Sequence, residues 1–239
     1  MKISKHLFTY CFRVFIVVII IIVNLFSNVI ISAGIIENVE DTENSETAGT
    51  AEKYIALTFD DGPHPIYTIK VLDILSEKNI PATFFVVGFR AELHPALLKK
   101  MRELKCEIGN HTYNHTDLSK VNQSSAVSQI EKCGGIIHSI TGEYPKIYRP
   151  PYGVISKANQ AVIPLEKIMW TVDSCDWKTG SAEKIVKNVT AAVKDRSIIL
   201  MHDFYEQTVD ALPEIIDILL NEGYKFVTVS ELYQLQLLQ

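Results

Sequence analysis

Two adjacent carboxylates, Asp60 and Asp61, lie in the stretch 58–63, which reads TFDDGP. The apolar run 54–57 precedes them and a Gly-Pro pair follows, a pattern that predicts a short buried strand ended by a turn. Because adjacent side chains on a strand point to opposite faces, we expect the two carboxylates to have different partners. One would hold a metal ion while the other handles a proton, although a solvated acidic turn also fits this motif alone.

Two histidines, His111 and His115, follow a short strand expected at 106–109. On a helical turn, residues four apart lie on one face, so both imidazoles could reach the same ion. With Asp61 they would form a two-histidine, one-carboxylate site that leaves positions for water and substrate, as a catalytic zinc ion requires. The same ligands also suit iron, cobalt or nickel, and a purely structural histidine pair is the alternative.

Arg149 precedes a stiff loop, 150–153, which reads PPYG. Proline restricts the backbone, so the amide of Tyr152 could be held toward a site. Arg149 could pair with a carboxylate and keep it ionised. A surface arginine beside a proline turn is the simpler interpretation of this segment in isolation.

Two further polar groups end apolar stretches near the C-terminus. The segment 173–177 reads DSCDW, in which Trp177 could stack on a sugar face or fill the core. His202 ends the apolar run 198–201. Beside a carboxylate such as Asp176, the pKa of His202 would rise and the imidazole could act as a general acid, although a satisfied core histidine is more common.

About seven apolar segments alternate with helical patterns, which predicts parallel strands joined by crossovers. A small distorted (β/α) barrel and an open sheet both satisfy this alternation. The barrel is favoured because the unusual polar residues follow strand after strand, and these positions meet at one rim only in a ring. The expected strands are 54–57, 82–87, 106–109, 146–149, 167–172, 197–201 and 225–229.

The first 36 residues stand apart from the rest. Their basic residues precede an uncharged apolar segment, 14–36, which predicts either a cleaved signal peptide or an N-terminal membrane anchor. Residues 37–53 predict an acidic linker, and 54–239 the folded domain. Because the basic residues stay inside, we expect the domain to be exported to the extracellular face of the membrane or to the cell wall.

The chain has 239 residues, of which 47% are hydrophobic and 21% charged, enough for one domain with a substantial core. A formal net charge of −5 gives no support for nucleic-acid binding. One of the four cysteines, Cys11, belongs to the leader, so the domain keeps an odd number. We expect these to be small buried residues, with a Cys106–Cys133 pair left open.

Taken in order, five segments resemble the polysaccharide deacetylases with the NodB homology domain, carbohydrate esterase family 4. The segments are 58–62 (TFDDG), 111–115 (HxxxH), 149–153 (RPPYG), 173–177 (DxxDW) and 200–202 (LxH). The resemblance covers essentially all of residues 54–236, and no catalytic position departs from the family pattern.

The resemblance implies a role for each matching residue. The implied metal ligands are Asp61, His111 and His115. Asp60 would be the base that deprotonates the metal-bound water, and Arg149 would orient it. His202 would protonate the departing amine, tuned by Asp176, and the Tyr152 amide would stabilise the oxyanion together with the metal. The residues implied to line the substrate pocket are Pro151, Tyr152, Trp177 and Leu200.

The implied activity is metal-dependent removal of N-acetyl groups from an extracellular aminosugar polymer. Peptidoglycan N-acetylglucosamine is the leading substrate and chitooligosaccharide the next, with one divalent ion, zinc before cobalt or nickel. An O-acetyl xylan esterase and a catalytically silent glycan-binding wall protein are the alternatives. We expect a monomer that contacts the membrane only through an uncleaved N-terminal segment and binds no nucleic acid.

Overall fold

The computed structural model describes residues 52–237. The leader expected at 1–36 and most of the linker expected at 37–53 lie outside these residues. No helix of the described part is long and apolar enough to cross a membrane.

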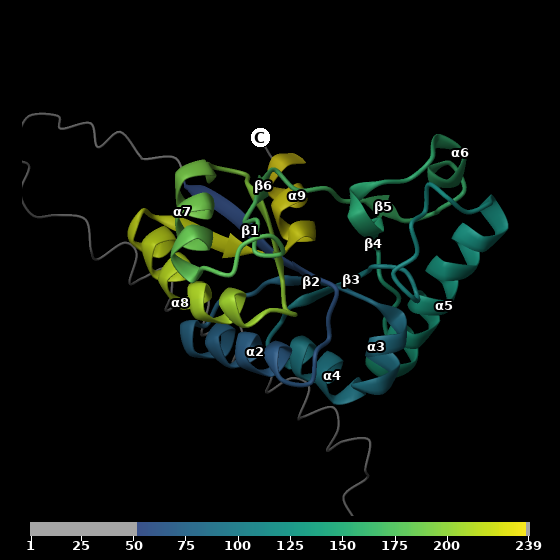
Figure 1. The fold of residues 1–239 in the computed structure, drawn as a ribbon, viewed down its shortest axis with the longest axis horizontal. Helices are drawn as coiled ribbons and strands as arrows, with labels where there is room; N and C mark the ends of the chain where they lie inside the picture. The colour runs from purple at the N-terminus through teal and green to yellow at the C-terminus, as the bar shows by residue number, and fades with distance from the viewer. Residues whose placement is uncertain (1–51, 238–239) are drawn as a thin grey trace, which may run out of the picture. The chain divides into compact units, whose positions relative to one another are not determined.

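A single sheet of parallel strands forms the centre of the domain and curls into a half-barrel, as the alternating pattern predicted (Figure 1). The strand order is β5-β4-β3-β2-β1-β7-β6, and β8 pairs with the first half of β1. The strands are β1 (Lys53–Asp60), β2 (Thr83–Val86), β3 (Glu107–Asn110), β4 (Ile147–Tyr148), β5 (Glu166–Lys167), β6 (Val172–Asp173), β7 (Ile198–His202) and β8 (Tyr224–Val227).

The prediction of one continuous strand at 167–172 is wrong, because this segment is divided between β5 and β6. Its first part pairs with β4 and its last part with β7, which lie toward opposite ends of the sheet order. Between them, Ile168 N donates to Tyr148 O at 2.9 Å and Thr171 N donates to Ile198 O at 2.9 Å. This segment therefore crosses the gap between the two ends of the sheet, which explains eight strands where about seven were expected.

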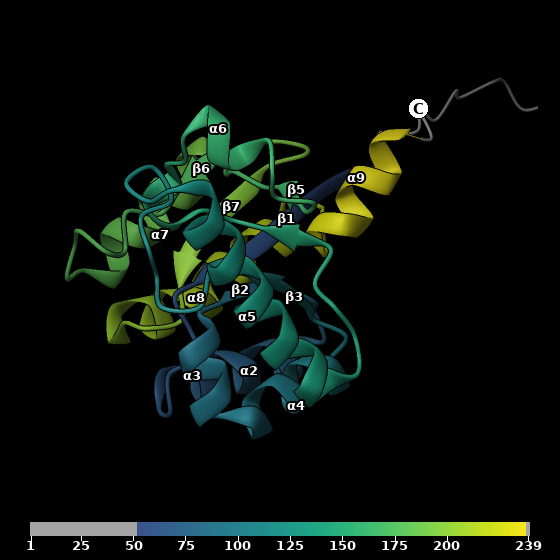
Figure 2. The same ribbon diagram turned by 90° about the vertical axis from the view of Figure 1, so that its right-hand side faces the viewer.

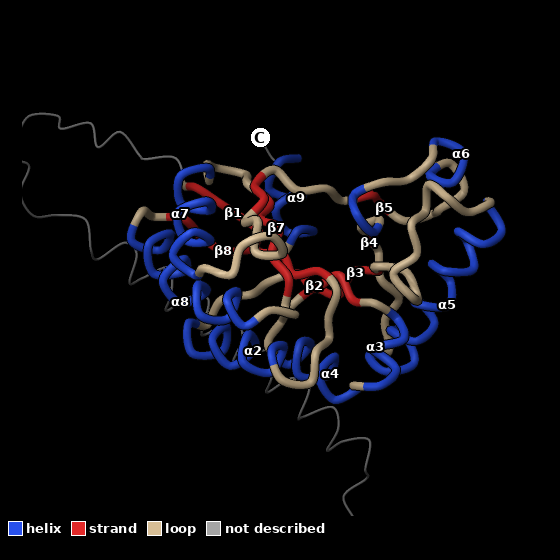
Figure 3. Tube along the Cα trace, in the orientation of Figure 1, coloured by secondary structure: helices blue, strands red, loops and turns tan. Residues whose placement is uncertain are grey.

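Helices surround the sheet, most of them on its outer face, whereas the C-terminal helix closes one end of the half-barrel (Figure 3). They are α2 (Tyr67–Lys78), α3 (Gly88–Leu93), α4 (Pro95–Glu103), α5 (Gln123–Thr141), α6 (Lys157–Gln160), α7 (Ala182–Ala192), α8 (Glu206–Asn221) and α9 (Val229–Leu237), with a 3₁₀ turn at Pro151–Gly153. Ser181 caps α7, with its side chain accepting a hydrogen bond from Lys184 N at 3.3 Å. Cys106 and Cys133 are buried free thiols, as predicted, whereas Cys175 is only partly buried, contrary to the prediction.

The alternation of side chains along β1 decides which residues face the site. Ile55, Leu57 and Phe59 belong to the main core beneath the helices. Ala56 faces the other way, into the interior of the half-barrel, and Asp60 follows on the same face. Figure 2 shows α9 beside the start of β1, and its apolar side chains pack into the interior at that end. The opposite end, where the strands finish, is left for polar residues.

Candidate active site

The strand ends surround a cavity of about 370 Å³. Its lining includes most of the residues singled out from the sequence: Asp60, Asp61, His111, His115, Tyr152, Trp177, Leu200 and His202. Arg149 and Asp176 lie fully buried behind this wall. Pro151 is buried within the 3₁₀ turn and is not among the described lining residues. The five separate motifs thus meet in one place.

Asp61 lies directly after β1 in the left-handed region, with a φ of 75°. This conformation takes its side chain off the strand, so its Oδ1 lies 3.0 Å from His115 Nε2 and 3.4 Å from His111 Nε2. Burial alone would raise the pKa of Asp61, but the two imidazoles lower it below its usual range. Asp60 has different partners, as expected.

The histidines converge through a loop and not through the helical turn that their spacing suggested. Residues 111–115 contain no helix, and both Thr112 and His115 have positive φ values, 66° and 60°. Side chains hold the loop: Thr112 N donates to Asn110 Oδ1 at 2.9 Å, and Thr116 N donates to Thr112 Oγ1 at 3.1 Å. The two imidazoles converge as expected, but the prediction that a helical turn brings them together was wrong.

The ligand atoms of Asp61, His111 and His115 all lie within 4.8 Å of one another, which suits a divalent ion. His111 Nδ1 lies 2.8 Å from the main-chain carbonyl of Arg149. Because a carbonyl only accepts, this contact places the proton on Nδ1 and leaves the Nε2 lone pair free to coordinate. Asp61 Oδ1 is buried and has no hydrogen-bond partner among the described residues. A buried, unsatisfied carboxylate oxygen between two imidazoles fits a metal ligand.

Asp60 pairs with Arg149, which reaches across the interior from the end of β4. Arg149 Nη1 donates to Asp60 Oδ1 at 2.7 Å and to Thr58 Oγ1 at 2.8 Å. The guanidinium carbon also lies 4.1 Å from the ring centre of Phe85. Both charged groups are buried, so each offsets the free-energy cost of removing the other from water. The hydrogen bond between them also fixes the direction of the Asp60 carboxylate.

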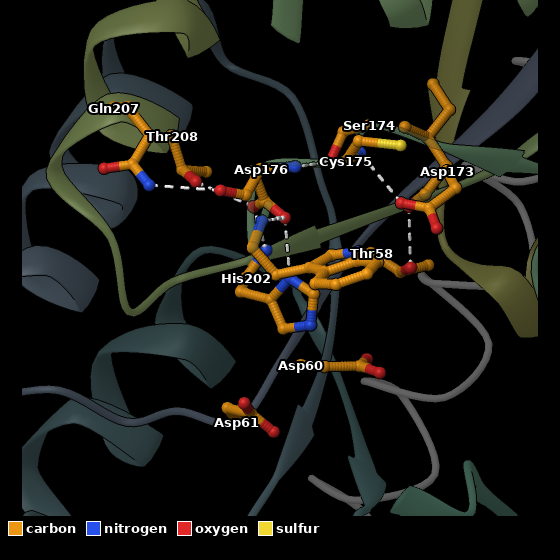
Figure 4. A network of polar contacts seen from close by, with 12 residues as sticks. Thr58, Asp60, Asp61, Asp173, Ser174, Cys175, Asp176, His202, Gln207 and Thr208 are labelled. Atoms are coloured by element: carbon orange, nitrogen blue, oxygen red, sulfur yellow. Dashed lines mark hydrogen bonds and ion pairs between the residues drawn. The ribbon is translucent and has the colours of Figure 1, made fainter. Parts of the chain in front are cut away.

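His202 is bound to Asp176 by two hydrogen bonds, as Figure 4 shows. Its main-chain N donates to Asp176 Oδ2 at 2.7 Å, and its Nδ1 lies 2.7 Å from Oδ1. Thr208 Oγ1 and Trp177 N also donate to this carboxylate, at 2.7 and 2.8 Å. Burial would lower the pKa of His202, but the hydrogen bond and charge of Asp176 outweigh it and raise the value to about 9. The imidazole is therefore positively charged at neutral pH.

Aromatic side chains form the open side of the cavity. Trp177 is 54% exposed and Tyr152 is 68% exposed, so Trp177 does not fill the core. Tyr152 has a φ of 60°, and its ring packs edge-on against His115 with 4.7 Å between ring centres. Trp170 and Tyr205 also line the cavity and were not foreseen. Tyr205 lies only three residues after His202, which was the one available signal for it.

Arg90 is another residue that the sequence analysis missed. It lies on α3, and its Nη1 donates to the main-chain carbonyl of Asp61 at 2.6 Å. Its guanidinium carbon lies 4.2 Å from the ring centre of Phe204, in the loop after β7. Arg90 therefore connects the loop of Asp61 with the loop that follows His202.

The sequence and the fold are both similar to those of characterised proteins. A family model described as polysaccharide deacetylase matches residues 47–164. The chain is 39% identical over 191 residues to the peptidoglycan-N-acetylmuramic acid deacetylase PdaC of Bacillus subtilis, covering 80% of this chain and 41% of that protein. It is 41% identical over 188 residues to a peptidoglycan-N-acetylglucosamine deacetylase of Bacillus cereus, covering 75% and 68%. The chain thus spans about two fifths of the length of the Bacillus subtilis relative.

Solved structures show the same similarity. The structure of Bacillus subtilis PdaC aligns with a TM-score of 0.76 at 39% identity, covering 78% of this chain and 92% of that chain. A family 4 acetyl xylan esterase from Clostridium thermocellum, in complex with a cobalt ion, aligns with a TM-score of 0.74 at 34% identity, covering 77% and 91%. Identity at this level over most of the described domain shows that the chain belongs to the polysaccharide deacetylase family, carbohydrate esterase family 4.

Proposed function

We propose that this protein is a metal-dependent deacetylase that removes N-acetyl groups from an aminosugar polymer, with peptidoglycan N-acetylglucosamine as the leading substrate. One observation carries the proposal. The candidate metal ligands lie in a single cavity with a buried Asp60–Arg149 pair and a charged His202–Asp176 pair. Hydrolysis of an amide needs an activated water, stabilisation of the oxyanion and an acid for the amine, and the cavity offers a group for each.

Asp60 is the proposed base. Its carboxylate lies at the cavity wall, held by Arg149, and its Oδ2 lies 3.9 Å from His111 Nε2. A divalent ion at the three ligands would polarise the acetyl carbonyl and lower the pKa of a bound water. Zinc is the first candidate for two imidazoles and a carboxylate, and cobalt or nickel would suit the same donors. The cobalt-bound Clostridium thermocellum relative supports this range.

His202 is the proposed acid for the leaving amine. It is the register partner of Asp60 on the adjacent strand, so the two side chains lie on the same face of the sheet. Because Asp176 keeps its imidazole charged, His202 can donate a proton at neutral pH. The main-chain amide of Tyr152 is the proposed oxyanion donor, since the turn of two prolines before it fixes the backbone.

The charges that line the cavity favour a neutral aminosugar as substrate over one that carries a carboxylate. Asp60, Asp61 and Asp173 line it, and no lysine or arginine is among its described lining residues. Asp60 is paired with Arg149, and Asp61 would be paired with the ion. Asp173 is therefore the carboxylate that the lactyl group of N-acetylmuramic acid would meet as a like charge. Exposed Trp177 and Tyr152 offer flat apolar faces for the sugar rings. The Bacillus cereus relative is named for N-acetylglucosamine and the Bacillus subtilis relative for N-acetylmuramic acid.

Acetate release tests the proposal. The protein is incubated with chitooligosaccharides and, separately, with purified peptidoglycan, each with added zinc or cobalt and with a chelator. We expect acetate release that the chelator abolishes and added metal restores, with peptidoglycan the better substrate. Absence of release from both polymers, with metal bound, would contradict the deacetylase proposal.

An O-acetyl xylan esterase is the second candidate. The acetyl xylan esterase from Clostridium thermocellum has a closely similar fold, and an ester could be hydrolysed by the same groups. Acetylated xylan is therefore included as a third substrate. A silent glycan-binding protein is less well supported, because both Asp60 and His202 are present and paired. We also infer export, supported by the basic residues that precede the apolar segment 14–36.

A further inference from the structure

A buried carboxyl group with no part in the proposed chemistry, Asp203, lies beneath the turn that carries Asp61. Asp203 follows His202 directly and is fully buried. Its Oδ2 accepts a hydrogen bond from Thr68 Oγ1, whereas its Oδ1 has no partner among the described residues. Burying a carboxyl group with an unsatisfied oxygen is costly, so its presence at this point calls for a physical explanation.

Thr68 connects this carboxyl group to the start of α2. Its side chain is fully buried, and its Oγ1 accepts a hydrogen bond from His64 N at 2.7 Å while donating to Asp203. A single hydroxyl therefore joins the loop after β1, the first turn of α2 and the end of β7. Because the hydroxyl both accepts and donates, valine at this position would break both contacts while keeping the shape.

Gly62 is enclosed between Asp203 and Val87, the residue that follows β2. A Cβ atom at Gly62 would lie 2.1 Å from Asp203 Oδ2, so the carboxyl group packs directly against the glycine backbone. On its other side, Gly62 O accepts a hydrogen bond from Val87 N at 2.9 Å. The residue before it, Asp61, has the left-handed φ of 75° that brings its carboxylate to the two histidines. That conformation is uncommon for residues other than glycine, although aspartate adopts it more readily than most, and surrounding contacts help to hold it.

We propose that Asp203, held by Thr68, is a positioning residue that fixes the Asp61–Gly62 turn in the geometry that binds the metal ion. This inference rests on the metal site proposed above. Asp203 does not touch the substrate or the ion in this scheme. It acts by limiting where Gly62 can lie, and so where the Asp61 carboxylate points. Groups that orient metal ligands in this way typically change metal affinity or activity by about 10- to 100-fold when removed.

Zinc titration of the metal-free protein tests the proposal, with affinity measured by calorimetry. Thr68→Val should raise the zinc Kd by about tenfold or more, since it removes the hydroxyl without a change of shape. Thr68→Ser keeps the hydroxyl and should restore the affinity to nearly that of the wild type. Thr190→Val is the matched control, because Thr190 Oγ1 donates to Val186 O within α7, away from the cavity.

The zinc titrations distinguish failure of the positioning role from failure of the metal site itself. An unchanged zinc Kd in folded Thr68→Val overturns the positioning role, as does an equal loss of affinity in Thr68→Ser. If Thr68→Val does not fold, Asp203→Ala removes the same contact from the other side, and an unchanged zinc Kd there overturns the proposal. If the wild-type protein binds no zinc or cobalt, the proposed metal site itself fails, and this inference fails with it.

Discussion

Asp60 and His202 are register partners on the adjacent parallel strands β1 and β7. Their side chains therefore leave the sheet on the same face, yet each is paired with a different buried group, Arg149 for Asp60 and Asp176 for His202. The proposed base and the proposed acid are thus held side by side by separate buried partners. This arrangement allows each function to be removed without the other.

The division of roles between Asp60 and Asp61 predicts that turnover and metal binding separate. Asp60→Asn should abolish acetate release while the metal stays bound, because Asp60 is not among the three converging ligand atoms. His111→Ala should lose both, because it removes a ligand. Metal content of the two purified variants, measured by emission spectroscopy, decides the matter. A metal-free Asp60→Asn protein would contradict the assignment of the base.

The contact between His202 and Asp176 predicts a pH limit on activity. The pKa of His202 is raised from 6.5 to about 9, so the acid is protonated below that value and activity should fall as the pH rises through about 9. Asp176→Asn removes the charge that outweighs burial, so the alkaline limb should move to lower pH. The kcat/KM profile of each variant measures this shift.

Asp173→Asn is the matched control, because Asp173 lines the same cavity but accepts its hydrogen bond from Cys175 N and not from His202. Its alkaline limb should stay where the wild type has it. An unmoved limb in Asp176→Asn would show that His202 is not the acid whose ionisation limits the rate.

The same pKa shift predicts how stability depends on pH. The pKa of His202 is higher in the folded protein than its ordinary value of 6.5, so protonation favours the folded state. The stabilisation is fully present below about pH 6.5 and is lost as the pH rises through about 9. Urea unfolding between pH 6 and 10 should show this loss in the wild type and a smaller one in Asp176→Asn.

The convergence of the site could be predicted because it depends on topology. Parallel strands end at the same edge of the sheet, so motifs that follow successive apolar segments must meet there. The separate partners of Asp60 and Asp61 were also predicted, although Asp61 is diverted by a left-handed backbone and not by strand alternation alone. The order of apolar segments and motifs along the sequence is enough to predict that the motifs meet, whatever conformation the connecting loops adopt.

The loops themselves could not be predicted. Threonine is β-branched and disfavours positive φ, so nothing in its residue type indicates the left-handed Thr112 that brings the histidines together. A side chain of β3, Asn110, holds it in place. Arg90 was missed for a similar reason, because its contact with Asp61 depends on the position of the short helix α3. The division of 167–172 was missed because a largely apolar segment does not reveal a change of strand partner.

The Asp60–Arg149 pair predicts a large loss of stability when one partner is removed. Arg149→Met leaves the Asp60 carboxylate buried without compensation, which should lower the free energy of unfolding by about 3–5 kcal/mol. Arg102→Met is the control, because its ion pair with Glu143 is exposed at 40% and 64% and should contribute at most about 1 kcal/mol. Urea unfolding measures the free energy of unfolding of both variants. An equally small decrease in both would show that Asp60 does not need Arg149 to stay buried.

Exposed Trp177 predicts a contribution to substrate binding that is separate from catalysis. It lines the cavity with more than half of its surface open, and its main-chain N binds Asp176, so its ring can be removed while that hydrogen bond remains. Trp177→Ala should raise KM for chitooligosaccharides by about tenfold, equivalent to about 1.4 kcal/mol, with a smaller change in kcat. Tyr144→Ala is the matched control, because Tyr144 is also more than half exposed but stacks on His138 outside the cavity. A fall in kcat at unchanged KM would instead mean that Trp177 acts through the Asp176–His202 pair.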